Sequence, residues 1–185
     1  MAAQAKTCFD DEAGAARPPV WQIRTLMSGL AGRLSSDPSF PASEETGMSI
    51  LDRYKAYADA FEESYEDDDW SRIEQYFTED AVYEGDPEDA CGRDAVLEKL
   101  KGGVDAFDRK LESRSPDFQT PTVDGNTLTM KWSVTYTKTG APDLVLTGVE
   151  TAVFEGDRIA RLRDDFAPDA SKAMGEWMAT HGGSL

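Results

Sequence analysis

The sequence has only one histidine, His181, and two cysteines, Cys8 and Cys91. A lone histidine in a glycine-rich tail argues against a Ser-His-Asp triad and against a multi-histidine metal site. The two cysteines show no metal-ligand spacing and no readable disulfide framework, so a reducing cytoplasm is the default expectation. A glycine-rich phosphate loop and a dinucleotide fingerprint are also missing. We therefore expect chemistry based on carboxylates, tyrosines or bound water, with no metal and no cofactor.

Basic residues are scarce as well. The chain has 36 acidic and 19 basic residues, which gives a formal charge of -17 and a pI of about 4.3. Such a field repels phosphate backbones and anionic membranes, so we expect no nucleic-acid and no membrane partner. No apolar run approaches the length of a membrane span, and Asp10, Asp11 and Glu12 stand where a signal peptide needs its apolar core. These features predict a soluble cytoplasmic protein with a solvated acidic surface.

The length and the apolar content of the chain are sufficient for one folded domain. The 185 residues are 39% hydrophobic and 10% aromatic, which suffices for a buried core. Residues 1–47 mix Ala, Gly, Pro and Ser with little periodicity, apart from a short amphipathic helix predicted over 21–34. We expect a flexible extension over 1–47 and a folded domain over 48–185. The extension is either a partner-docking segment or the product of a mis-assigned translation start.

The segment from Tyr54 to Glu84 has the most structured pattern. Its aromatic residues recur at three- and four-residue steps over 54–65, which predicts an amphipathic helix. Four consecutive acidic residues at 66–69 predict a break, and a second short helix and a strand should follow. This order resembles the opening of the SnoaL-like group in the nuclear-transport-factor-2-like superfamily. The matching residues are Tyr57 to Phe61, Asp69-Trp70, Ile73, Phe77, Asp80 to Glu84, Cys91 to Val96 and Gly156 to Phe166.

A third helix is predicted over 93–107, after which the hydrophobic period changes from helical to two. Alternation predicts a strand over 127–136, with 118–123 as its hairpin partner, and further strands over 144–154 and 159–166. Helices followed by strands predict an α+β fold with helices on one face of an antiparallel sheet. The resemblance implies a cone-shaped curved sheet whose open end is a pocket, and residues 168–181 are predicted to form a closing helix.

The same alternation singles out ionisable residues on apolar faces. Asp164 shares a face with Ala160, Leu162 and Phe166, and Glu150 stands among equally apolar neighbours. On the first strand, Glu84 is expected beside Val82. Burial raises a carboxyl pKa and can tune the group for general acid or base work near neutral pH. Alternatively, Asp164 pairs with an arginine or ends its strand through a bulge.

The resemblance implies particular roles. SnoaL-like polyketide cyclases use a pocket aspartate as acid/base, and Asp164 is the candidate here. Ketosteroid-isomerase-like relatives pair a helix-one tyrosine with an aspartate, which points to Tyr57 with Glu84 or Asp86, although Tyr57 is alternatively a core residue. Limonene-epoxide-hydrolase-like relatives need an Arg-x-Asp pair, which residues 131–133 lack. Epoxide hydrolysis is therefore not expected.

We predict a small-molecule pocket protein that binds an apolar ligand or substrate and forms a homodimer. Its function is expected to be that of an isomerase, cyclase or hydratase using carboxylate general acid/base catalysis. The alternative is a non-catalytic ligand-binding or dimerisation module of the same fold. The predicted catalytic residues are Asp164, Glu84 and Tyr57, and the predicted pocket residues are Phe61, Met130, Trp132 and Glu150.

Overall fold

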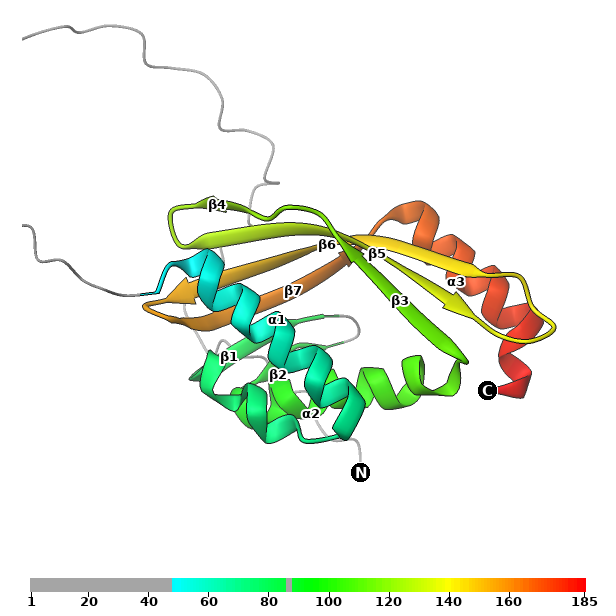
Figure 1. Cartoon of the computed structure of the whole chain (residues 1–185), viewed down its shortest axis with the longest axis horizontal. Coiled ribbons are helices and arrows are strands. Elements are labelled where there is room, and N and C mark those ends of the chain that lie inside the picture. Colours follow the sequence, from blue (N-terminus) through cyan, green and yellow to red (C-terminus); the bar gives the residue numbers. More distant parts are fainter. Residues whose placement is uncertain (1–47, 86–87) are drawn as a thin grey trace, which may run out of the picture. The chain divides into compact units, whose positions relative to one another are not determined.

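The computed structural model describes residues 48–85 and 88–185. The expected extension over 1–47, its helix over 21–34 and Asp86 lie outside the described residues. The described part is an α+β domain in which α1 and α2 lie on the same side of a curved sheet (Figure 1). Its elements in chain order are α1 (Ile50–Asp67), η1 (Trp70–Tyr76), β1 (Phe77–Glu84), β2 (Ala90–Cys91), α2 (Arg93–Ala106), η2 (Asp108–Lys110), β3 (Ser113–Phe118), β4 (Thr122–Asp124), β5 (Thr127–Thr137), β6 (Leu144–Glu155), β7 (Arg158–Phe166), α3 (Pro168–His181) and η3 (Gly182–Ser184).

Local signals at both ends set the length of α1. Ser49 is the N-cap, and its hydroxyl accepts a hydrogen bond from the backbone N–H of Asp52. The helix ends at Asp67, and the C-cap Asp68 takes a left-handed φ of 66° and donates its N–H to the Ser64 carbonyl. Between these ends, the buried face carries Tyr54 and Tyr57. The aromatic spacing in the sequence therefore places both rings against the sheet.

The sheet has seven strands and a mixed topology. Its strands run in the order β2-β1-β7-β6-β5-β3, with β4 also paired to β5. Strands β3 to β7 pair in an antiparallel manner, as predicted, but β1 and β7 are parallel neighbours, with Tyr83 beside Leu162. A parallel pair needs a long crossover rather than a hairpin, and almost the whole domain supplies it here. The sheet is curved but not closed, because β2 and β3 end the pairing order.

The predicted hairpin partner over 118–123 does not form one strand. Instead, β3 and β4 pair with successive parts of β5, and residues 119–121 between them belong to neither strand. Pro121 lies in this interruption, and proline has no N–H to give to a sheet ladder. The earlier start of β3 brings Arg114 into the sheet, opposite Tyr136.

A bulge in β7 changes which residues face inward. Phe154 pairs with Ile159, and Val153 pairs with Arg161, so Ala160 is an extra residue in the ladder. As a result Ile159 and Leu162 are both fully buried, whereas strict alternation placed them on opposite faces. The bulge precedes Asp164, which keeps the same side of the strand as Leu162.

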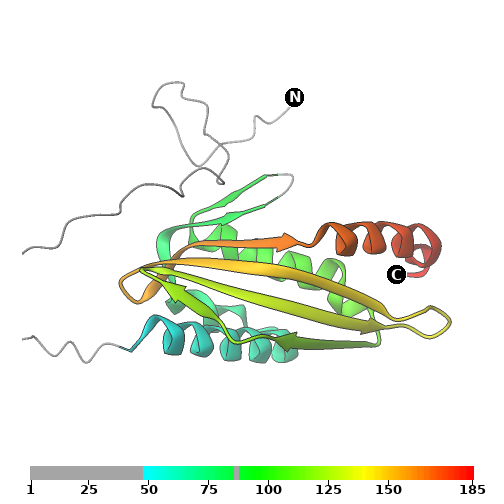
Figure 2. The ribbon, with the colours of Figure 1, turned by 90° about the horizontal axis from the view of Figure 1, so that it is seen from above.

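Two apolar clusters stabilise the domain. The larger lies where α1, η1 and α2 meet β1 and β5–β7. The smaller lies under α3, where Trp177 packs and donates its indole N–H to the Pro142 carbonyl at 2.9 Å. The helix predicted over 168–181 is thus present, and it continues beyond the end of β7 (Figure 2).

Two findings concern the expected compartment. Cys91 is disulfide-bonded, which the cysteine spacing did not predict. The cysteines therefore no longer support a reducing cytoplasm, and the location stays a prediction. Within the described residues, no helix combines the length and the apolar character that crossing a bilayer requires.

Candidate active site

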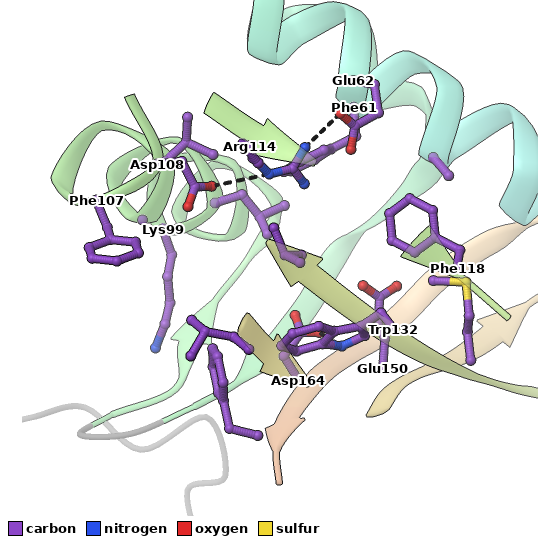
Figure 3. A pocket seen from close by; sticks show the side chains of 18 of the residues that line it. Phe61, Glu62, Lys99, Phe107, Asp108, Arg114, Phe118, Trp132, Glu150 and Asp164 are labelled. Carbon is purple, nitrogen blue, oxygen red and sulfur yellow. Dashed lines mark hydrogen bonds and ion pairs between the residues drawn. The ribbon is translucent and has the colours of Figure 1, made fainter. Parts of the chain in front are cut away.

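A cavity of about 580 Å³ lies between α1, α2 and the inner side of the sheet (Figure 3). This volume is in the range that small-molecule sites occupy, and most of its wall is apolar or aromatic, as is usual for such sites. The structure brings six of the seven predicted site residues to its wall, whereas Glu84 lies elsewhere. The six are Tyr57, Phe61, Met130, Trp132, Glu150 and Asp164.

The two predicted carboxylates form a pair at one end of the cavity. Glu150 on β6 and Asp164 on β7 are direct partners across the antiparallel ladder, and both side chains line the cavity. Cross-strand partners lie close enough for their side chains to interact. Their hydrogen-bond partners among the described residues are aromatic side chains, with no lysine or arginine. The alternative in which an arginine neutralises Asp164 is therefore not the arrangement found.

Three aromatic donors hold the pair. The Tyr54 hydroxyl donates to Glu150 Oε1 at 2.5 Å. Asp164 accepts from the Tyr83 hydroxyl at 2.9 Å through Oδ2, and from the Trp132 indole N–H at 3.2 Å through Oδ1. Tyr54 and Tyr83 were not predicted as site residues. Tyr54 was recognisable as one turn before Tyr57 on the same helical face.

The surroundings separate the acidities of the two carboxyl groups. Burial raises the pKa of Glu150, and the negative charge of Asp164 raises it further. Burial also raises the pKa of Asp164, but the hydrogen bonds from Tyr83 and Trp132 stabilise its charged form and oppose that rise. When the pair loses one proton, that proton therefore comes preferentially from Asp164, and Glu150 stays protonated. The cavity then holds a base, Asp164, next to an acid, Glu150.

A glycine makes room for Trp132. Gly148 on β6 lies opposite Trp132 on β5. A Cβ at Gly148 would collide with the indole ring and would lie 2.7 Å from the Asp165 carbonyl oxygen. The ring is also held edge-on against Phe166 at a centroid distance of 5.2 Å. Gly148 thus allows the indole to lie across β6 and to reach Asp164.

Tyr57 is part of the cavity wall. Its ring is buried and packs edge-on against Phe61, Tyr76 and Phe77. Its hydroxyl makes no hydrogen bond to another described residue. Burial and the nearby carboxylates raise its pKa well above the ordinary value, so the hydroxyl stays protonated and can donate. Tyr57 is therefore both a core residue and a potential hydrogen-bond donor to a ligand.

Glu84 lies outside the cavity, contrary to the expectation that it faces inward beside Val82. Its carboxylate pairs with Arg161 at 3.2 Å and with Arg163 at 3.8 Å. Ala81 is fully buried, so Tyr83, two residues later, lies on the same side of β1 and reaches the cavity, whereas Glu84 does not. Glu79 is exposed and the register with β7 is irregular between Phe77 and Val82, so alternation toward the cavity holds only from Ala81 onward.

A second polar cluster lines another part of the same cavity. Arg114 Nη1 donates to Glu62 Oε2 at 2.7 Å, and Arg114 Nε lies 3.6 Å from Asp108 Oδ2 (Figure 3). The Tyr136 hydroxyl donates to Asp108 Oδ1 at 2.7 Å. Burial raises the pKa of Asp108, although Tyr136 and Arg114 both favour its charged form. The sequence carried no signal for this cluster, because four separate elements contribute to it.

No group of three or more histidine, cysteine, aspartate or glutamate side chains in the described part of the chain could hold a metal ion. The donor set at the carboxylate pair consists instead of two tyrosines and a tryptophan, whose O–H and N–H groups point at the acids. Such donors suit proton transfer and hydrogen bonding to an organic ligand.

The chain resembles known proteins both in sequence and in structure. A family model described as a SnoaL-like domain matches residues 55–162. No curated protein matches. A protein assigned as a SnoaL-like polyketide cyclase, from Shewanella putrefaciens, aligns with a TM-score of 0.52 and 10% identity, over 80% of this chain and 100% of that one. TerC co-crystallised with polyporic acid aligns with a TM-score of 0.53 and 14% identity, over 71% of this chain and 99% of that one. An NTF2-like protein of unknown function from Burkholderia pseudomallei aligns with a TM-score of 0.52 and 14% identity, over 70% of this chain and 98% of that one. At these identities the structural likeness shows the fold alone.

Proposed function

Because the chain belongs to the SnoaL-like domain family, we propose that it is an acid/base enzyme that acts on a small apolar carbonyl or cyclic compound in this cavity. Isomerases, cyclases and hydratases share the underlying step, which is proton transfer at a carbon next to a carbonyl group. The observation that carries the proposal is the pair Glu150 and Asp164, adjacent across the sheet, facing the cavity and held by neutral donors.

We assign each side chain its catalytic role from its surroundings in the cavity. Asp164 is the base: its carboxylate accepts the proton from the substrate carbon, and the C–H electron pair moves toward the carbonyl oxygen. The Tyr57 hydroxyl donates a hydrogen bond to the oxygen that gains the negative charge. Glu150 is the acid and returns a proton to the substrate, because its pKa is raised by burial and by Asp164. The apolar wall excludes water and strengthens these electrostatic effects.

The comparisons support this choice of chemistry at the level of the family. A protein assigned as a polyketide cyclase shares the fold, and another structure of the fold was obtained with polyporic acid. Both point to cyclic organic compounds as the class to test first.

The test is hydrogen–deuterium exchange. The protein is incubated with 2-tetralone or 1-indanone in D₂O, and NMR follows the loss of the C–H signal next to the carbonyl. We expect the wild-type protein to accelerate exchange and the double variant Asp164→Asn, Glu150→Gln to lose the acceleration. Equal exchange rates for the wild type and the double variant with both ketones would contradict the proposal.

A further inference from the structure

We propose that Arg114, with Glu62, Asp108 and Tyr136, forms a second binding subsite that accepts an uncharged oxygen of the ligand, such as a ketone. The ligand's other end would lie against Glu150 and Asp164, so this inference rests on the proposed function of the same cavity. The subsite would set the ligand's orientation. Figure 3 shows the Arg114 cluster and the carboxylate pair in different parts of the cavity.

The first argument is the state of the Arg114 side chain. It is 9% exposed and lines a largely apolar cavity, where a cation needs partners. A guanidinium has five N–H donors. Glu62 accepts one of them, from Nη1, at 2.7 Å, and the guanidinium carbon lies 5.1 Å from the centre of the Tyr65 ring. Asp108 lies 3.6 Å from Nε, beyond hydrogen-bond distance, and Nε is too deeply buried for a ligand to reach, so the donors open to a ligand are those of the terminal Nη groups. The cluster therefore offers more donors than its own carboxylates accept.

The charges around Arg114 determine which kind of hydrogen-bond acceptor on the ligand can bind there. Two carboxylates, on Glu62 and Asp108, already lie beside the single positive charge of Arg114. The only other cation on the cavity wall, within the described residues, is Lys99, which is bound to the Glu88 carbonyl and lies 5.3 Å from the Tyr83 ring. An added carboxylate or sulfonate would be repelled by the acids. A ketone, ester or amide oxygen can accept a hydrogen bond without that cost.

The distance between the carboxylate pair and the Arg114 cluster indicates how long the ligand must be. Tyr54, which contacts Glu150, and Glu62, which contacts Arg114, are eight residues apart on α1. Eight residues correspond to about 12 Å along a helix axis. Apolar side chains that line the cavity include Phe61, Val134 and Leu146. The ligand should therefore be long and apolar, with a proton donor or reacting carbon at one end and an oxygen acceptor at the other.

The experiment compares three biphenyl probes by titration calorimetry. 4-Acetyl-4'-hydroxybiphenyl carries a hydroxyl for the carboxylates and a ketone for Arg114. 4-Hydroxybiphenyl lacks the ketone, and 4'-hydroxybiphenyl-4-carboxylate replaces it with an anion. We expect the ketone to bind the wild-type protein about tenfold more tightly than 4-hydroxybiphenyl, and the carboxylate to bind more weakly than the ketone. Equal affinities for the first two probes, or tightest binding of the carboxylate, would overturn the proposal.

Variants assign the effect to Arg114. Arg114→Gln should remove the preference for the ketone, whereas Arg109→Gln, which alters an arginine outside the cavity, should keep it. If Arg114→Gln does not fold, a crystal structure of the wild-type protein with the ketone probe tests the subsite by the position of the ketone oxygen. A ketone oxygen within hydrogen-bond distance of Arg114 supports the subsite, and one placed against Tyr83 or Trp132 overturns it. Asp164→Asn should abolish deuterium exchange but keep the ketone preference, so the two proposals can fail separately.

Discussion

Glu150 and Asp164 face each other across β6 and β7 and share one cavity, yet each accepts hydrogen bonds from different aromatic donors. Asp164 has two such donors and Glu150 has one. This difference gives two neighbouring carboxyl groups different affinities for protons, because each hydrogen bond to a carboxylate stabilises its charged form.

Replacing Asp164 by asparagine should lower the rate of deuterium exchange in 2-tetralone about 100-fold or more, since a positioned base contributes at least that factor. The asparagine side chain keeps the size of aspartate but cannot accept a proton. The matched control is Asp165→Asn, because Asp165 is the next residue, is exposed and pairs with Arg163 at 2.6 Å. A similar loss of rate in both variants would indicate a general disturbance of β7 rather than a role for Asp164.

Stability should depend on pH through Glu150. Burial and Asp164 raise its pKa in the folded state above its ordinary value of 4.5, so the folded protein holds a proton that the unfolded chain releases. The free energy of unfolding therefore falls as pH increases from the unfolded pKa through the folded one. Urea unfolding of the wild type at about pH 5 and about pH 9 should show a larger decrease than Glu150→Gln shows. An equal decrease in the two proteins would refute the raised pKa.

Removing a donor should raise the pKa of Asp164. The Tyr83 hydroxyl stabilises the charged carboxylate at 2.9 Å, so Tyr83→Phe should shift the titration of Asp164 to higher pH. The shift can be measured by carbon-13 NMR of the side-chain carboxyl group. Tyr76→Phe is the control, because Tyr76 is buried outside the cavity. An unchanged titration in Tyr83→Phe would show that this hydrogen bond has no effect on the acid.

Gly148→Ala should displace Trp132. The added methyl group overlaps the indole and the Asp165 carbonyl, which should cost about 1–3 kcal/mol of stability. The displaced indole should change its fluorescence and lose its hydrogen bond to Asp164. Gly102→Ala on α2 is the counterpart, because its Cβ meets nothing within 4 Å and alanine favours a helix by about 0.5–1 kcal/mol. Normal stability and unchanged fluorescence in Gly148→Ala would contradict the assigned role of Gly148.

Local patterns in the sequence predicted much of the fold and part of the site. The helical spacing of the α1 aromatics and the alternation along β6 and β7 do not depend on distant residues, so they indicated Tyr57, Glu150 and Asp164 as facing the cavity. Glu84 was misplaced because only the buried position of Ala81 reveals which side of the end of β1 faces inward.

Features that depend on pairing between distant segments were not predictable. The parallel contact of β1 with β7 and the early start of β3 have no local signature. The Arg114 cluster requires side chains from α1, η2, β3 and β5 to meet, and neither hydrophobic period nor spacing encodes that meeting. The bulge at Ala160 likewise depends on the register with β6.

The parallel contact between β1 and β7 has a consequence for synthesis of the protein. Tyr83 leaves the ribosome long before Leu162, its neighbour in the sheet, and Asp164 emerges later still. During translation, β1 therefore lacks its β7 neighbour until the last strand of the sheet has emerged, and the nascent chain exposes apolar surface in that interval. The carboxylate pair cannot assemble before β7 is synthesised, so a chain truncated ahead of β7 would lose its base and the sheet neighbour of β1 together.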